Sequence, residues 1–255
     1  MIHVNRRSYP YMEEVNEGIV REFRRLLPIS DRVLDVGCGQ GQLGQAIREL
    51  GWEVWGVEQS PRACAVARDR LHRLIEADLH DQGRIEQAIG AERFDAVIFS
   101  DVLEHVYDPR TVLERYLGFV KPGGRVFVSV PNFVVWTNRL KLLLGRVSYD
   151  DTGVMDRTHI RLFSFRTARQ LLEAVGLSVT RVASTPHLVR AFLPLIKRVM
   201  GGSSSVNPRA LLDSKSYRLY MKYCYPAEQW LASLWRTLFA FRIIVVGQKS
   251  AEEGT

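Results

Sequence analysis

Short apolar segments alternate with amphipathic ones along the first half of the chain. The apolar segments have the length and boundaries of buried strands; they span 32–37, 52–58, 74–79, 94–101 and 124–131. The segments between them carry apolar residues at helical spacing; they predict helices over 41–51, from Ser60, over 84–90, and from Asp108 to about Val120. A further amphipathic helix is predicted over 11–27, before the first strand.

Alternating strands and helices limit the possible folds. Consecutive strands joined by helices of roughly ten residues need right-handed crossovers, which give a parallel sheet with both faces covered. The sequence therefore predicts an α/β fold built on one parallel sheet.

The alternation becomes irregular after Pro131. The pattern then predicts a helix, a structured loop, a helix and two strands, over 133–146, 149–165, 167–176, 177–184 and 241–249. GGSSSVNP interrupts a helical stretch before the last strand, and we interpret it as a loop rather than a domain boundary. We expect one domain, with an N-terminal helix in 11–30, a core over 31–185, a helical insertion over 186–240 and a last strand over 241–248.

Composition agrees with a single globular domain. The 255 residues are 46% hydrophobic and 25% charged, an ordinary globular balance. Cys38, Cys64 and Cys224 follow no metal or disulfide spacing, which suits a reducing compartment. We expect a cytoplasmic protein with no signal peptide and no membrane-spanning helix.

The glycine-rich segment LDVGCGQGQLG (34–44) fits two fingerprints. From Gly39 it reads G-x-G-x-x-G, the spacing of dinucleotide-binding turns; from Asp35 it reads D-x-G-x-G-x-G. Asp35 separates the two, because a carboxylate at the strand end would repel a pyrophosphate bound at the helix N-terminus. S-adenosylmethionine (SAM) has no phosphate and carries an ammonium and a sulfonium, so the same carboxylate would attract it.

Five segments, in this order, resemble the class I SAM-dependent methyltransferases. They are DVGCGQG (35–41), GVEQS around Glu58, EADL around Asp78, FSDVLEHVYDP (99–109) and LGFVKPGGRVFVSVPN (117–132). The resemblance covers about 11–249. It implies a doubly wound, seven-stranded, mostly parallel Rossmann-like sheet whose last strand is antiparallel. It also implies SAM as methyl donor, with S-adenosylhomocysteine as the product.

The SAM site is expected at the carboxyl ends of these strands. Glu58 would accept hydrogen bonds from the ribose hydroxyls and Asp78 from the adenine amino group, while the glycines let the backbone approach the ligand. The expected set is Asp35, Gly37, Cys38, Gly39, Gly41, Glu58, Gln59, Asp78, Leu79, Ser100, Asp101 and His105.

The acceptor side is expected at DRTHIR (156–161). Methyl transfer from a sulfonium is an in-line displacement, and an oxygen acceptor must also lose a proton. His159 is the favoured base, with Asp156 to orient it; His105 is either a second candidate base or part of the SAM pocket. The residues expected to hold the acceptor are Asn132, Arg157 and Arg161.

Three further segments resemble particular sub-groups of these methyltransferases. DVLEHV, VPNFVVWTNRLKLLLGR and DRTHIRLFSF resemble methyltransferases of glycan and antibiotic biosynthesis and ubiquinone-type O-methyltransferases. The second segment is also similar to W-type proteins of methionine biosynthesis. In ubiquinone-type relatives the positions of Asp101, Glu104 and His105 are associated with a divalent metal. Relatives without metal share the Glu-His pair, so we expect no metal, and these three are the candidates if one binds.

The leading functional hypothesis is O-methylation of a sugar, a lipid-linked glycan or a related metabolite, with a histidine base. Two alternatives stay open. One is methylation of a phenolic quinone precursor, and the other is a SAM-binding partner protein without turnover of its own.

A basic, aromatic stretch over 187–242 suggests a further partner. It holds nine Lys or Arg against two acidic residues, enough to account for the net charge of +7. Cationic side chains interleaved with Trp and Tyr are typical of interfacial membrane helices, so docking on anionic lipid is one hypothesis, with peripheral association at the inner face of the membrane. A lid or a homodimer contact is the other. No nucleic-acid partner is expected, because no binding module accompanies the charge.

Overall fold

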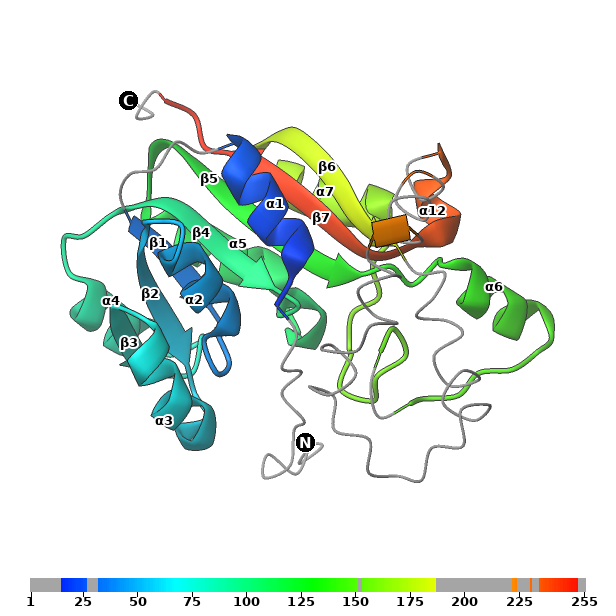
Figure 1. The fold of residues 1–255 in the computed structure, drawn as a ribbon, viewed down its shortest axis with the longest axis horizontal. Coiled ribbons are helices and arrows are strands. Elements are labelled where there is room, and N and C mark those ends of the chain that lie inside the picture. The colour runs from blue at the N-terminus through cyan, green and yellow to red at the C-terminus, as the bar shows by residue number, and fades with distance from the viewer. Residues whose placement is uncertain are drawn as a thin grey trace.

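The fold centres on one seven-stranded sheet (Figure 1). The computed structural model describes residues 15–26, 32–150, 153–186, 222–223, 230 and 234–251. The strand order is β3-β2-β1-β4-β5-β7-β6, and β7 alone runs antiparallel, between β5 and β6. The strands are β1 Arg32–Val36, β2 Glu53–Glu58, β3 Arg73–Glu76, β4 Phe94–Ser100, β5 Val120–Pro131, β6 Ser178–Pro186 and β7 Ala240–Gln248.

Helices cover both faces of the sheet and create two separate hydrophobic cores. One core is formed with α1, α2 and α3, and the other with α4, α5 and α7; in Figure 1, α1 crosses in front of β5 and β7. Their bounds are α1 Glu17–Leu26, α2 Gln42–Arg48, α3 Pro61–Arg70, α4 Gln82–Ile89, α5 Pro109–Leu117 and α7 Phe165–Ala174. Two further described helices, α6 Trp136–Leu143 and α12 Arg236–Phe239, lie near the carboxyl end of β5 and the start of β7.

Burial on both faces explains why the strands are apolar at nearly every position. In β4, Val97 and Phe99 point into one core, while Ala96 and Ile98 point into the other. The expected parallel α/β sheet and the antiparallel last strand are therefore confirmed.

Local sequence signals correctly predicted where most of the helices and strands begin. The side chains of Ser60 and Asp108 cap α3 and α5, and each is followed by Pro at the first helical position. Strand β5 starts at Val120, earlier than predicted, because Val120 pairs with Phe94 of β4. The register then shifts, and the next paired residue of β5 is Arg125, so 121–124 form an irregularity within the strand. The expected helix over 11–27 is seen as α1, which begins at Glu17. Residues 15 and 16 are described and are not helical, and 11–14 and 27 lie outside the described residues.

Most of the predicted insertion, including GGSSSVNP, also lies outside the described residues. We expected the helical insertion to end at residue 240 and the last strand to begin at 241; that strand, β7, begins at Ala240. Among the described residues, no helix is long and apolar enough to cross a membrane.

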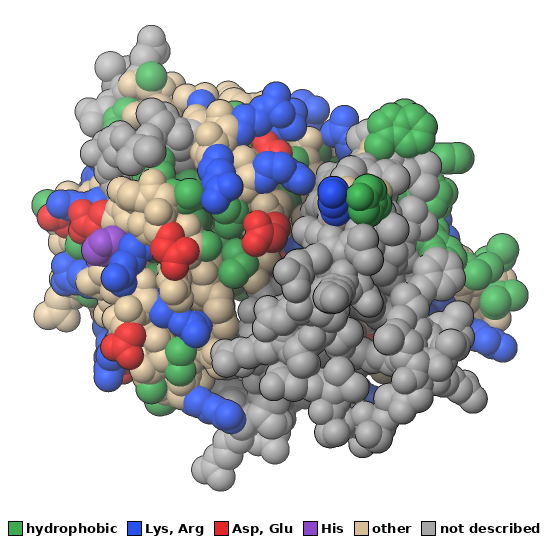
Figure 2. Space-filling model, in the orientation of Figure 1, with side chains coloured by type: hydrophobic (Ala, Val, Ile, Leu, Met, Phe, Trp, Pro, Cys, Tyr) green, Lys and Arg blue, Asp and Glu red, His purple; other side chains and the backbone are tan. Residues whose placement is uncertain are grey.

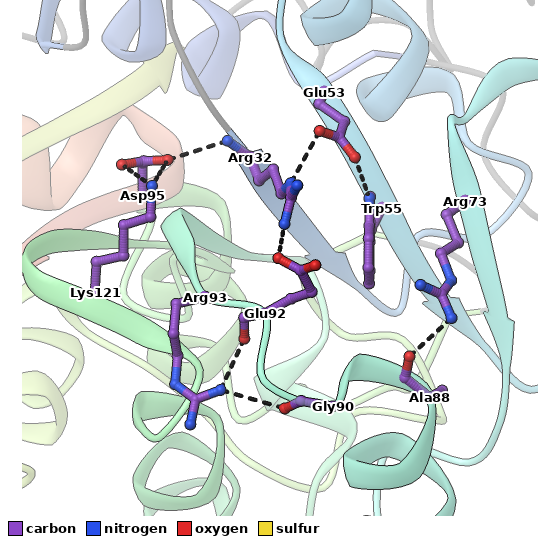
Figure 3. A network of polar contacts seen from close by, with 10 residues as sticks. All are labelled: Arg32, Glu53, Trp55, Arg73, Ala88, Gly90, Glu92, Arg93, Asp95 and Lys121. Atoms are coloured by element: carbon purple, nitrogen blue, oxygen red, sulfur yellow. Dashed lines mark hydrogen bonds and ion pairs between the residues drawn. The ribbon is translucent and has the colours of Figure 1, made fainter.

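The amino edge of the sheet is tied by a network of charged side chains (Figure 3). Arg32 pairs with Glu53 and Glu92, and Lys121 pairs with Asp95. These contacts link the starts of β1, β2, β4 and β5, on the side opposite the carboxyl ends where parallel sheets bind ligands. We therefore assign this network to the stability of the sheet.

Candidate functional site

The glycine loop joins the carboxyl end of β1 to α2. Gly37, Gly39 and Gly41 all have positive φ, which L-residues with a Cβ rarely adopt. A Cβ on Gly37 would also lie 2.8 Å from Cγ2 of Val102, in the loop after β4. Glycine is therefore required at Gly37 both for the turn and for the close approach of the β4 loop.

Asp35 is a buried carboxylate next to this loop. It is 2% exposed, and its Oδ2 has no hydrogen-bond partner among the described residues. Burial, with a smaller contribution from the charge of Glu58, raises the pKa of Asp35 from 3.8 to about 7. Burial of an ionised carboxylate costs free energy, and a cation beside Asp35 would reduce that cost. The predicted contact with the ammonium of SAM would place such a cation there.

Glu58, at the end of β2, holds the glycine loop through backbone amides. Its Oε2 accepts a hydrogen bond from Gly39 N at 3.0 Å, and its Oε1 accepts from Gln59 N at 2.9 Å and Ser60 N at 2.7 Å. Asp78 follows β3, and its Oδ1 accepts from His80 N. Parallel register aligns Val36 with Val57 and Glu58 with Glu76, so these groups share one edge of the sheet.

Asp101, after β4, has both carboxylate oxygens engaged. Oδ1 accepts from Ser129 Oγ at 2.8 Å, and Oδ2 pairs with Arg242 Nε at 2.8 Å. Asn16, just before α1, donates to Ser129 Oγ at 2.8 Å and to Ser100 Oγ at 3.1 Å. Asp101 also has φ of 55°, the only positive value for a non-glycine residue among those described. It therefore anchors the turn into the next segment.

That segment is a short 3-10 helix, η1 Leu103–His105, which meets the DRTHIR loop. The rings of His105 and His159 are 4.9 Å apart, centre to centre, in an edge-to-face arrangement. Glu104 is buried, and its backbone carbonyl accepts hydrogen bonds from Ile160 N and Arg161 N. The structure thus brings together His105 and His159, the two expected bases, 54 positions apart in the sequence.

The electrostatics of this cluster follow from its burial. Burial raises the pKa of Glu104 well above its ordinary value, and the neighbouring Asp101 adds to the effect. Burial and the adjacent His159 lower the pKa of His105. Both shifts favour the uncharged forms of the two side chains.

Other predicted acceptor residues make local contacts in the described structure. Asp156 Oδ1 accepts from Thr158 N and Oγ1, so it shapes the loop, and Val154 O rather than Asp156 contacts the His159 ring. The Arg161 guanidinium donates to Tyr107 O.

Arg157 and Asn132 complete the predicted acceptor set. Arg157 is exposed on the same loop. Asn132, after β5, is fully buried and donates to Ala240 O at the start of β7. Its Oδ1 has no hydrogen-bond partner among the described residues.

Sequence reasoning missed the residues that support the site from other elements. They are Asn16, Ser129 and Arg242. One signal was available, because Arg242 interrupts the otherwise apolar run FRIIVVG, and a charged residue inside a buried strand needs a partner.

Comparison with known proteins shows which family and which solved structures this architecture resembles. The family described as "Methyltransferase domain" matches residues 10–182. A SAM-dependent methyltransferase from Archaeoglobus fulgidus is similar in structure, with a TM-score of 0.55 and 17% identity, over 91% of this chain and 93% of that one. Magnesium protoporphyrin IX methyltransferase from Synechocystis PCC 6803, solved with bound S-adenosylhomocysteine, has a TM-score of 0.54 and 16% identity, over 91% and 80% of the chains.

Sheet order, glycine loop and carboxyl-edge acids together define a class I methyltransferase fold. With the family match over residues 10–182, the chain belongs to the methyltransferase-domain family, and its fold is that of the SAM-dependent methyltransferases.

Curated relatives share part of the chain. Ubiquinone biosynthesis O-methyltransferase of Xanthomonas axonopodis pv. citri is 39% identical over 113 residues, which cover 42% of this chain and 46% of that protein. The protein of the same name from Pseudomonas aeruginosa is 31% identical over 159 residues, covering 58% and 68%. The match to the Xanthomonas relative thus spans less than half of its length.

Proposed function

We propose that this protein transfers the methyl group of SAM to a hydroxyl oxygen, and that the acceptor is a phenol of the quinone-precursor type. The observation that carries the proposal is the cluster of Glu104, His105 and His159 at the carboxyl edge of the sheet. A hydroxyl must lose its proton as the carbon–oxygen bond forms, and this cluster offers two imidazoles and a carboxylate there. The ubiquinone biosynthesis O-methyltransferases among its relatives support the phenolic acceptor.

The roles of the chain's own residues follow from their positions. Asp35 would hold the ammonium of SAM, Glu58 the ribose and Asp78 the adenine, so that the methyl group faces the loop after β4. The assignment of the base to His159 stays a prediction, and replacement of His159 by Ala should abolish turnover while SAM still binds.

The sugar or lipid-linked acceptor expected from the sequence stays a second hypothesis. Arg157 and Arg161 were its motivation; Arg161 donates to Tyr107 O, and Arg157 is exposed on the same loop. A SAM-binding protein without turnover is the third hypothesis.

An acceptor panel separates the three hypotheses. Release of S-adenosylhomocysteine would be measured with catechol-type quinone precursors, nucleotide sugars and polyprenyl-linked saccharides, each with and without a divalent cation. Turnover on a catechol is the expected result, and turnover only on a sugar would contradict it. SAM binding without turnover on any acceptor would favour the partner-protein hypothesis. Asp35→Asn serves as the control that should bind SAM only weakly.

Docking on anionic lipid remains a proposal for the surface around the site. Most of 187–242 lies outside the described residues, but α6 adds support. Leu140, Leu142, Leu143, Leu144 and Val147 are exposed there beside Arg139, Lys141 and Arg146, and Figure 2 shows hydrophobic and basic side chains together where Figure 1 places α6. This combination suits an interfacial helix.

Vesicle sedimentation tests this surface. We expect binding to phosphatidylglycerol vesicles that weakens with salt, and weaker binding after Leu143→Asp. Equal sedimentation with neutral phosphatidylcholine vesicles would contradict the electrostatic part of the proposal.

A further inference from the structure

The loop after β3 has hydrogen-bonding groups available for the adenine end of SAM. Asp78 and Leu79 lie there and are half-buried. Oδ1 of Asp78 accepts a hydrogen bond from His80 N at 3.0 Å, while Asp78 Oδ2 and Leu79 N have no hydrogen-bond partner among the described residues. An acceptor beside a donor is complementary to the amino group and N1 of adenine, which are neighbours on one edge of the base.

Tyr116 of α5 contacts this loop from the hydrophobic core. Its hydroxyl donates to Leu79 O, with 3.3 Å between the two oxygens. The tyrosine is 2% exposed, and its burial, with a smaller contribution from the charge of Asp78, raises the pKa of the hydroxyl well above its ordinary value. The hydroxyl therefore stays protonated at neutral pH and always serves as a donor.

Two aromatic neighbours fix the direction of the Tyr116 side chain. The rings of Phe99, in β4, and Phe119, just after α5, contact the tyrosine ring edge to face, with ring centres 5.4 and 5.9 Å away. Phenylalanine would fill the same space in this core and keep both ring contacts. The hydroxyl is thus not needed for packing, and the one hydrogen bond that it makes among the described residues goes to Leu79.

We propose that Tyr116 is a positioning residue for SAM, whose hydroxyl holds Leu79 so that the Asp78 carboxylate and the Leu79 N–H meet the adenine together. This inference rests on the proposed function, because it requires that the chain binds SAM with the adenine at Asp78. Since Tyr116 is buried, it acts through Leu79 and not by contact with the ligand. Its effect is on selectivity for adenine, because a loop held in one conformation matches one pattern of donors and acceptors.

Calorimetric titration of the full chain with two ligands tests the proposal without any acceptor. One ligand is S-adenosylhomocysteine. The other is S-inosylhomocysteine, in which a carbonyl replaces the amino group of the base and N1 carries a hydrogen. The two ligands share the ribose and the amino-acid part, so the ratio of their affinities reports on the base alone. We expect wild type to prefer the adenine ligand, because the inosine ligand reverses both hydrogen bonds.

Tyr116→Phe removes one hydroxyl and keeps the ring. It should weaken binding of S-adenosylhomocysteine by about 2- to 10-fold, the range for the loss of one hydrogen bond, and leave binding of the inosine ligand nearly unchanged. The preference for adenine should therefore shrink. Tyr149→Phe makes the same chemical change at an exposed position and should behave as wild type. Near-ultraviolet circular dichroism checks that each variant is folded.

Asp78→Asn tests the adenine placement itself. With Oδ1 still bonded to His80 N, the amide NH₂ replaces the oxygen that would face the base, and the preference for adenine should be lost. Loss of the preference in Asp78→Asn, together with a reduced preference in Tyr116→Phe, would support the inference.

The remaining outcomes separate this inference from the proposed function. A preference that Asp78→Asn removes and Tyr116→Phe leaves intact would overturn the role of Tyr116 and leave the SAM site in place. Equal weakening of both ligands in Tyr116→Phe would overturn that role as well, because the hydroxyl would then not act on the base. No preference in wild type, or an intact preference in both variants, would overturn the inference together with the adenine assignment. Failure of wild type to bind S-adenosylhomocysteine would overturn the proposed function and this inference with it.

Discussion

At the scale of single residues, three buried or half-buried carboxylates near the carboxyl edge have different surroundings. Asp101 is paired with Arg242 and bonded by Ser129. Asp35 and Glu104 are more deeply buried, and each has at least one oxygen without a partner among the described residues. Burying a charge without a partner costs stability, so these two positions are where a cationic ligand would contribute most.

Asp35→Asn should separate ligand binding from stability. The folded-state pKa of Asp35, about 7, lies above its ordinary 3.8, so the folded protein binds a proton that the unfolded chain releases. The contribution to stability is therefore present below pH 4 and is lost as the pH rises to about 7. The variant should lack this loss and be more stable than wild type at pH 8, by roughly 2–4 kcal/mol, in urea unfolding.

The same variant should bind SAM poorly. Wild-type affinity should rise between pH 5.5 and 7.5, because the ionised carboxylate attracts the ammonium of SAM, whereas the variant should show weak binding without this rise. Asp69→Asn makes the same chemical change at an exposed position and should behave as wild type. A variant that keeps wild-type affinity would remove Asp35 from the site.

At the scale of elements, the site depends on close packing between loops of neighbouring strands. The loop after β1 and the loop after β4 touch where Gly37 faces Val102. The loop after β4 then leads through η1 to the DRTHIR loop, which returns to β5 through the pairing of Asn132 with Phe163. The loops that carry the site residues are therefore in contact with one another.

Gly37→Ala tests this contact. Alanine is strained at φ of 70° and would meet Val102, so we expect a loss of about 1–3 kcal/mol in unfolding free energy and weaker SAM binding. Gly83→Ala is the matched control, because a Cβ there meets nothing within 4 Å and the residue lies in α4. It should stabilise the protein by about 0.5–1 kcal/mol. Equal effects of the two substitutions would refute the steric argument.

At the scale of the whole molecule, α1 connects distant parts of the fold. Phe23 packs against Phe127 of β5 with ring centres 4.4 Å apart, and Glu22 pairs with Arg181 of β6 at 3.0 Å. Asn16 reaches the serines that hold Asp101. The helix thus joins the edge of the sheet to the candidate site.

Arg181→Ala should therefore cost more than a surface ion pair does. Glu22 is 2% exposed, and without Arg181 it would keep only the longer pair with Arg21, at 3.8 Å. Its buried charge would then be poorly compensated, and we expect a loss of about 1–3 kcal/mol in unfolding free energy. Arg169→Ala breaks the exposed pair with Glu173 on α7 and should cost less than about 0.5 kcal/mol. Urea unfolding of both variants measures the two losses of unfolding free energy. Similar losses would show that the buried Glu22–Arg181 pair stabilises the protein no more than an exposed pair does.

The sequence by itself determined the order of elements, the α/β class and the glycine loop. These features are local: apolar periodicity, the Ser60 and Asp108 caps and the spacing from Asp35 to Gly41 all lie within short stretches. It also placed Glu58, Asp78 and His105 at one edge, because carboxyl ends of parallel strands meet there. Strand β5 was predicted too short, since the pairing of Val120 with Phe94, separated from Arg125 by a register shift, depends on a neighbouring strand.

Only the tertiary structure decided which side chains meet. No local pattern could show that Arg242 and Ser129 occupy Asp101, or that His159 lies against His105 and Glu104. These contacts join residues tens of positions apart, and burial, which sets the charge of Asp35 and Glu104, is likewise a property of the packed molecule. Strand order and loop packing bring those groups together, so the chemistry of the acceptor side follows from the fold rather than from any single motif.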